Sequence, residues 1–252
     1  MVSTTLAYDR LSAKRLHAVP GRRFDHYFFS GTAWLMLASV LVGFGPSYYL
    51  AGVFRAPLPS LIIHIHGALF SCWILLLIAQ NSLAWAGRVD IHKRLGLAGF
   101  LLACLMVIVG WMAATDRLAR GTAPAGLDSY FFYIVPMTDM VIFATLIFFA
   151  YRMRRDPAAH KRIIYIATVG ILIAAIARFP SKWLFHNAPH AAIASYAFLL
   201  LLISYDLWST RKIHRATLWA GAFLIFVQQI RLPIGKTAAW HSFAAWVQSI
   251  AR

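Results

Sequence analysis

Glutamate is absent from this chain, and its only acidic residues are eight aspartates. This absence excludes HExxH metalloproteases and glutamate-based di-iron bundles, because both depend on glutamate side chains. Cysteine is scarce as well. Cys72 and Cys104 lie in apolar stretches without CxxC or Cys/His spacing, which disfavours a disulfide framework or a zinc ribbon.

Linker sequences are also lacking, since no Pro-, Gly- or Ser-rich run divides the chain. Residues 1–23 mix polar and basic residues without an apolar core, so we expect a cytoplasmic basic tail and no secretory signal. Residues 24–252 are expected to form a single domain.

Apolar residues dominate what is present. They make up 61% of the 252 residues, whereas charged residues make up 13%, about half the share in a soluble domain. A helix needs about 20 apolar residues to cross a bilayer. Seven stretches qualify: 27–45, 59–86, 95–115, 130–151, 161–178, 191–209 and 215–232. The sequence predicts an all-α, polytopic bundle of about seven transmembrane helices in the bacterial inner membrane.

The basic residues predict how this bundle is oriented. With the N-terminus inside, 16 of the 24 lysines and arginines fall on the cytoplasmic side, which is the bias expected for an N-in, C-out protein. The net charge of +16 therefore indicates topology and attraction to anionic membrane lipids. No nucleic-acid-binding module is recognisable, so we expect no nucleic-acid partner.

A short polar motif recurs four times, each time where an apolar stretch begins. An aspartate precedes a histidine that lies beside basic residues, as in an internal repeat. In an alternating bundle, all four copies lie on the same side of the membrane. The copies are Arg22-Arg23-Phe24-Asp25-His26, Asp90-Ile91-His92-Lys93-Arg94, Asp156 to His160-Lys161-Arg162, and Asp206 to His214-Arg215.

Two copies of this motif suggest a haem site at the cytoplasmic end. His92 and His160 begin their helices with the same His-Lys-Arg sequence and could face each other at one depth. Haem b needs two such imidazoles on different helices, with each ring held by a second hydrogen bond. Asp90 and Asp156 are the local candidates for those bonds. The alternative is that these residues bind lipid headgroups at the interface.

Histidines near the outer end suggest a second site. His64 and His66 are about 200° apart on a helix, so they cannot easily bind one metal together, and Gly67 favours His66 as the functional residue. His186 and His190 have HxxxH spacing, although Pro189 predicts a turn between them. With His64 and His66 they are candidate ligands for zinc or iron.

Asp139 is expected inside the membrane, where a carboxylate costs about 2.5 to 3.5 kcal/mol even on lenient scales. Residues of this kind are usually functional or paired. We expect it to contact Arg178, a histidine or a ligand, with Asp139 and Arg178 as candidate catalytic residues. The alternative is a pair with Arg178 or Arg231 that only locks helices together.

Part of the chain, about residues 60–180, resembles a known family. The motif His66-Gly67…Trp73…Gln80…Gly87-Arg88…His92-Lys93-Arg94-Leu95-Gly96…Gly99, with His160-Lys161-Arg162 and Arg178 further on, resembles a widespread family of uncharacterised bacterial membrane proteins. More distantly, it is similar to cytochrome b561-type proteins.

The second resemblance implies two bis-histidine haem sites. It would make His66 an outer ligand, and His92 and His160 the inner pair. The stretch from Tyr130 to Tyr151 contains no histidine, so the outer partner would have to be His186 or His190.

Three functions follow as hypotheses. The leading one is a b-type membrane cytochrome that passes electrons between a quinol and an acceptor or partner subunit. The second is a metalloenzyme that acts on a lipid or apolar substrate at the outer face. The third is a non-enzymatic subunit or transporter with Asp139 and Arg178 as its gate. The expected partners are membrane lipids, a quinone, and either a partner redox subunit or further copies of this chain.

Overall fold

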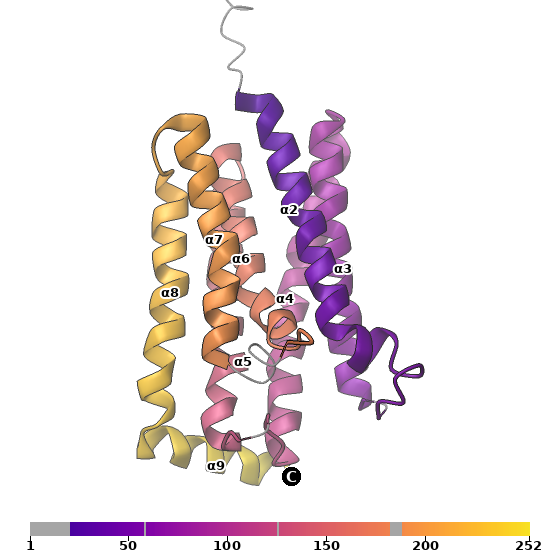
Figure 1. Ribbon diagram of the computed structural model, residues 1–252, viewed down its shortest axis with the longest axis vertical. Helices are drawn as coiled ribbons and strands as arrows, with labels where there is room; N and C mark the ends of the chain where they lie inside the picture. The colour runs from indigo at the N-terminus through magenta and orange to yellow at the C-terminus, as the bar shows by residue number, and fades with distance from the viewer. Residues whose placement is uncertain (1–20, 58, 125, 182–187) are drawn as a thin grey trace, which may run out of the picture.

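The computed structural model describes residues 21–57, 59–124, 126–181 and 188–252 (Figure 1). These residues form helices and no strand. Seven helical spans are long and apolar enough to cross a membrane, which confirms the predicted all-α bundle and its number of spans. The elements are α2 (Gly21–Phe44), the π-helical turn η1 (Gly45–Tyr49), α3 (Leu61–Trp85), α4 (Val89–Ala119), α5 (Ser129–Arg152), α6 (Pro157–Ile176), α7 (Ala188–Thr210), α8 (Arg215–Gly235) and α9 (Ala238–Ala251).

Polar caps at several helix starts explain where those helices begin. The Asp156 carboxylate accepts from the backbone N–H groups of Ala158 and Ala159 at the start of α6. At the start of α8, His214 Nδ1 accepts from the N–H of Ala216, 3.1 Å away. Burial lowers the pKa of His214, which keeps the imidazole neutral and able to accept this bond at neutral pH. These bonds satisfy N–H groups that a helix leaves unpaired.

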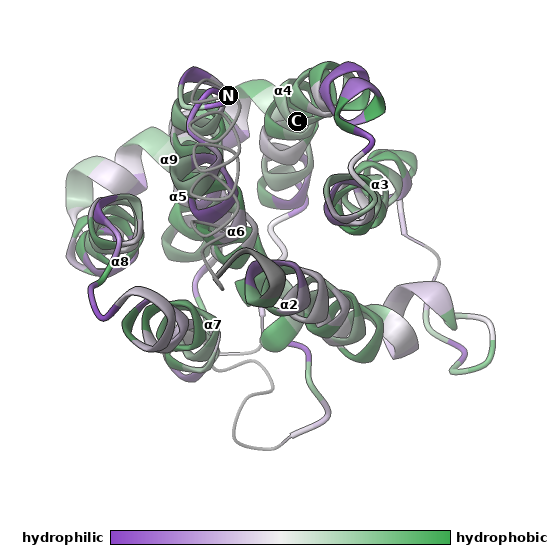
Figure 2. Ribbon diagram, turned by 90° about the horizontal axis from the view of Figure 1, so that it is seen from above, coloured by the Kyte–Doolittle hydropathy of each residue, from purple (hydrophilic) through white to green (hydrophobic). Residues whose placement is uncertain are grey.

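Five helices form a closed ring. In sequence order, α2 packs on α3, α3 on α4, α4 on α5 and α5 on α6, and α6 returns to pack on α2. The remaining two spans lie outside this ring, with α7 against α6, and α8 against α5 and α6. Figure 2 shows this arrangement end-on, with α7 and α8 to one side of the other helices. Any site inside the ring is therefore screened from lipid by helices.

Tightly packed side chains fill the middle of the ring. Trp73 on α3 donates through Nε1 to Thr168 Oγ1 on α6, 3.2 Å away. Its indole also meets the ring of Phe143 on α5 edge to face, with the centroids 5.1 Å apart. Because Phe143 and Thr168 are fully buried, this layer separates the two ends of the ring interior.

A buried ion pair joins α6 to α7 and α8. The Arg162 guanidinium donates to Asp206 Oδ1 at 2.9 and 2.6 Å. The other carboxylate oxygen, Oδ2, accepts from the His214 N–H and the Thr217 hydroxyl. Asp206 is 0% exposed and Arg162 is 3% exposed. The Arg162 side chain therefore points into the bundle, so within its His-Lys-Arg motif the headgroup-binding alternative does not apply to this arginine.

Helix α9 was not predicted from the sequence. It lies across the lower end of the bundle, at a steep angle to the other helices (Figure 1). The indole of Trp240 donates to the Tyr130 carbonyl at 2.8 Å, and the Gln248 amide donates to the Leu118 carbonyl at 2.6 Å. These bonds hold α9 against the ends of α4 and α5.

The four Asp/His junctions lie at the end of the bundle opposite α9, because α2, α4, α6 and α8 all begin there. The N-in, C-out orientation stays a prediction. We expect reporter fusions after Arg155 to be cytoplasmic and fusions after Arg252 to be external. Cytoplasmic signals from both fusions would contradict this orientation. In the following sections the two ends of the bundle are called inner and outer in this sense.

Candidate functional site

His92 on α4 and His160 on α6 both lie at the inner end of the ring. Each lies in the first turn of its helix, and the two imidazoles are close enough to interact electrostatically. His160 Nδ1 donates to the Ala150 carbonyl at 2.8 Å, which leaves Nε2 of the neutral ring available as an acceptor or a ligand. His92 Nδ1 is buried and has no hydrogen-bond partner among the described residues.

The aspartates do not hold these two rings. Asp156 caps α6, and Asp90 lies 3.8 Å from Arg88 with most of its side chain exposed. The prediction that they orient His92 and His160 is therefore wrong. A backbone carbonyl at the end of α5 orients His160 instead, which sequence spacing could not reveal because the bond joins two helices.

Gln80 on α3 completes this inner cluster. Its Nε2 donates to the His92 carbonyl at 3.2 Å, while its Oε1 is buried without a partner among the described residues. A Cβ added to Gly96 would lie 3.3 Å from the same amide nitrogen, and one added to Gly99 would lie 2.7 Å from Leu76. The absence of a side chain at Gly96 and Gly99 therefore allows α3 and α4 to pack closely.

At the outer end, His64 and His66 diverge. His64 is exposed, whereas His66 turns inward, stacks on Phe70 at 4.1 Å and has a buried Nδ1 without a described partner. A Cβ on Gly67 would lie 2.7 Å from the ring of Tyr48, so an aromatic side chain of the chain itself occupies the space beside Gly67.

Arg178 follows the end of α6 and lies close enough to His66 for its charge to act on the imidazole. Its guanidinium lies over the ring of Phe44 at 4.7 Å and donates to the Ala174 carbonyl at 2.5 Å. The charge of Arg117 on α4 also reaches Arg178. The predicted pair between Arg178 and Asp139 is not formed.

Asp139 pairs instead with Arg231 on α8. The Asp139 Oδ1 to Arg231 Nη1 distance is 2.6 Å, and the two side chains are 9% and 3% exposed. The gate of Asp139 and Arg178 that the transporter hypothesis requires is therefore not formed. Gln228, one turn earlier on α8, is buried with both side-chain polar atoms unpaired among the described residues.

Replacing Asp139 with leucine is expected to destabilise the fold more than replacing it with asparagine. Asp139→Leu leaves Arg231 buried without an anion, which typically costs about 3 to 5 kcal/mol. Asp139→Asn keeps the shape and one acceptor oxygen, so we expect a smaller loss. The yield and thermal midpoint of the purified variants test this order, and equal stability of the two variants would contradict it.

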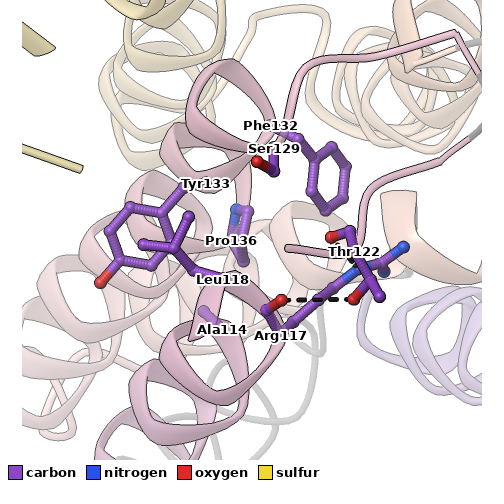
Figure 3. Close-up of a pocket in the computed structure, with 8 residues that line it drawn as sticks. All are labelled: Ala114, Arg117, Leu118, Thr122, Ser129, Phe132, Tyr133 and Pro136. Carbon is purple, nitrogen blue, oxygen red and sulfur yellow. Dashed lines mark hydrogen bonds between the residues drawn. The ribbon is translucent and has the colours of Figure 1, made fainter. Parts of the chain in front are cut away.

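A small cavity lies near the outer ends of α4 and α5 (Figure 3). It offers about 10 Å³ to the centre of a water molecule, which is about enough for one. Arg117 is one of the residues that line it. The guanidinium lies 4.8 Å from the Phe132 ring centroid and donates through Nε to the Thr122 carbonyl at 3.2 Å. The sequence did not single out Arg117, because a basic residue near a helix end is commonly an interfacial anchor.

Metal ligands are not gathered at the outer end of the described chain. Among residues 21–57, 59–124, 126–181 and 188–252, no three histidine, cysteine or aspartate side chains are close enough to hold one metal ion. His190 lies in the first turn of α7. His186 lies outside the described residues, so the predicted pairing of His186 with His190 or His66 stays a prediction.

The polar residues described above fall at two levels. An inner cluster is defined as His92, His160 and Gln80. Toward the outer end lie His66, Arg178 and Arg117, which no described contact joins into one site. Gln80 and His66 are 14 residues apart on α3, which separates their levels by about 21 Å at 1.5 Å per residue. Comparison of the chain with known protein families, with curated proteins and with solved structures gives no match.

Proposed function

We propose that this chain is a membrane redox protein that binds one haem b between His92 and His160. The observation that carries the proposal is that these two imidazoles, from α4 and α6, lie at the same end of the ring, near enough for the charge of one to act on the other. Haem b is held by axial ligands of this kind, and a ligating histidine usually donates its other ring nitrogen to a carbonyl or carboxylate. The bond from His160 Nδ1 to the Ala150 carbonyl meets that requirement.

The residues near His92 and His160 are compatible with haem, which has an apolar macrocycle and two acidic propionate groups. Ala150, whose carbonyl accepts from His160, and Ala159, which precedes His160, are small and buried. Lys93 and Arg94 follow His92 and are exposed at the inner end, where they would pair with the haem propionates. No described aspartate bonds to either imidazole, so neither ring has a carboxylate that would favour the imidazolium form over a neutral ligand.

A haem bound there would supply one-electron redox chemistry. The chain supplies the two ligands, fixes the tautomer of His160 and surrounds the pair with helices that exclude lipid. A quinol in the membrane is the proposed donor, and a partner subunit or a soluble acceptor at the inner face is the proposed recipient. The family resemblance of residues 60–180 supports the same assignment.

The test is the optical spectrum of the purified protein before and after reduction with dithionite. We expect a Soret band, a sharp reduced α band and about one haem b per chain, because the inner cluster supplies one pair of ligands. Protein produced with ample haem supply that shows neither band would refute the proposal. Bound zinc or iron without haem would favour the metalloenzyme hypothesis.

A further inference from the structure

We propose that a groove between the outer end of α4 and the end of α9 binds one phospholipid of the outer leaflet, with an acyl chain at its apolar end and the phosphate at its polar end. The groove has a volume of about 430 Å³, within the range of about 300 to 1,000 Å³ that is typical of ligand sites. Lipid binding here is independent of haem binding at the inner end. The lining residues are Trp111, Met112, Thr115, Asp116, Ala119 and Ala251.

The groove follows one face of α4. Five of its lining residues belong to the last turns of this helix and recur every three or four positions, which places them on the same face. The sixth, Ala251, is the last residue of α9. Figures 1 and 2 both show the C-terminus beside α4, and Arg252 donates through Nε to the Ala119 carbonyl at 3.4 Å. The groove therefore runs along α4 toward the outer surface, where α9 lies across its end.

The deeper end of the groove is apolar. Trp111 and Met112 are 38% and 53% exposed, and the Trp111 indole is held by a bond from Nε1 to the Met137 carbonyl at 3.4 Å. Both residues continue a stripe of exposed apolar side chains along α4, namely Leu97, Leu101, Leu105 and Ile108. In a helix that spans a bilayer, such a stripe contacts acyl chains. An acyl chain is therefore the expected occupant of this end.

The other end of the groove is polar and carries two arginines. Arg120 lies nine residues beyond Trp111, which is about 13 Å along a helix. Its guanidinium lies 2.6 Å from the Asp116 carboxylate, and this pair is partly exposed. Arg252 is exposed, and no described carboxylate forms an ion pair with it. Guanidinium groups bind phosphate in bidentate fashion, so Arg252, beside Arg120, is suited to a phosphate at this end.

The order of the two ends matches a phospholipid. Its phosphate lies at the membrane surface and its acyl chains extend toward the middle of the bilayer, as the polar and apolar ends of the groove do. Free phosphate would satisfy only the polar end, and diacylglycerol would satisfy only the apolar end. A phospholipid satisfies both.

The experiment compares two lipids that differ only in the headgroup. The full chain is purified in mild detergent and mixed with equal amounts of dioleoyl phosphatidylglycerol and dioleoylglycerol, and native mass spectrometry counts the lipid that stays bound. We expect phosphatidylglycerol to be retained at least about tenfold more, because only its phosphate forms charge-assisted hydrogen bonds. Equal retention of the two lipids, or a dimer of the chain without bound lipid, would overturn the proposal.

Variants then locate the bound lipid. We expect Arg252→Gln to lower the retention of phosphatidylglycerol about tenfold, because it removes the charged donor. Lys236→Gln is the matched control, since Lys236 is an exposed cation at the other end of α9. Ala251→Trp fills the groove and is expected to lower retention as well, whereas Ala239→Trp, at an exposed position near the start of α9, is not. Equal retention by the site and control variants would overturn the proposal.

Discussion

Replacing His160 with alanine is expected to remove the haem signal of this protein, and replacing His92 is expected to remove the same signal. A haem left with one imidazole binds more weakly and changes spin state. Loss of residues that merely orient a metal ligand costs about 10- to 100-fold in affinity, so loss of a ligand should cost at least about tenfold. Haem content per chain and the position of the reduced α band measure this effect.

His64→Ala is the matched control for both variants. His64 is an exposed histidine near the start of α3, at the outer end of the bundle, and its ring lies 5.6 Å from that of Tyr48. We expect this variant to keep its full haem content. Unchanged haem content in both His92→Ala and His160→Ala would instead make these residues interfacial anchors, as the alternative interpretation of the His-Lys-Arg motif holds.

The largest loss of stability is expected from Asp206→Ala. This change leaves the Arg162 guanidinium buried without a counter-ion and also removes the acceptor of the His214 N–H and the Thr217 hydroxyl. Breaking one side of a buried ion pair typically costs about 3 to 5 kcal/mol. Because the total stability of a domain is about 5 to 15 kcal/mol, we expect poor yield or a strongly lowered thermal midpoint.

Asp90→Ala provides the comparison for this prediction. Asp90 lies 3.8 Å from Arg88, and the two side chains are 66% and 59% exposed, so its pair is a surface pair. Such pairs contribute about 0 to 1 kcal/mol, and we expect near-normal stability. Denaturation in mild detergent, followed by tryptophan fluorescence, gives both values. A difference below about 1 kcal/mol between the two variants would contradict the structural role of Asp206.

The bundle was predictable because its signal is carried by composition and run length. Seven apolar stretches predict seven membrane spans, regardless of which helices pack against each other. The capping residues Asp156 and His214 also mark where two of these helices begin. Helix α9 escaped the prediction because its 14 residues are too few to span a bilayer. Its amphipathic pattern, with Ala244, Val247 and Gln248 on the buried side, was the available signal.

Pairing between helices was far less predictable. The sequence indicated that Asp139 needs a partner, but spacing along the chain does not distinguish Arg178 from Arg231. Only the packing of α8 on α5 decides in favour of Arg231. The same holds for His160, whose ring is oriented by a carbonyl of α5 that has no side-chain signature in the sequence. His92 and His160 could be proposed together because they share a motif and a depth.

The most direct measurement of the haem assignment is the low-temperature electron paramagnetic resonance spectrum of the oxidised protein. Two imidazole ligands predict a low-spin ferric signal in the unmodified chain. The account predicts that this signal is lost in His92→Ala and in His160→Ala, with any remaining haem high-spin. A low-spin signal that survives both substitutions, or an unmodified chain that contains no haem, would contradict it.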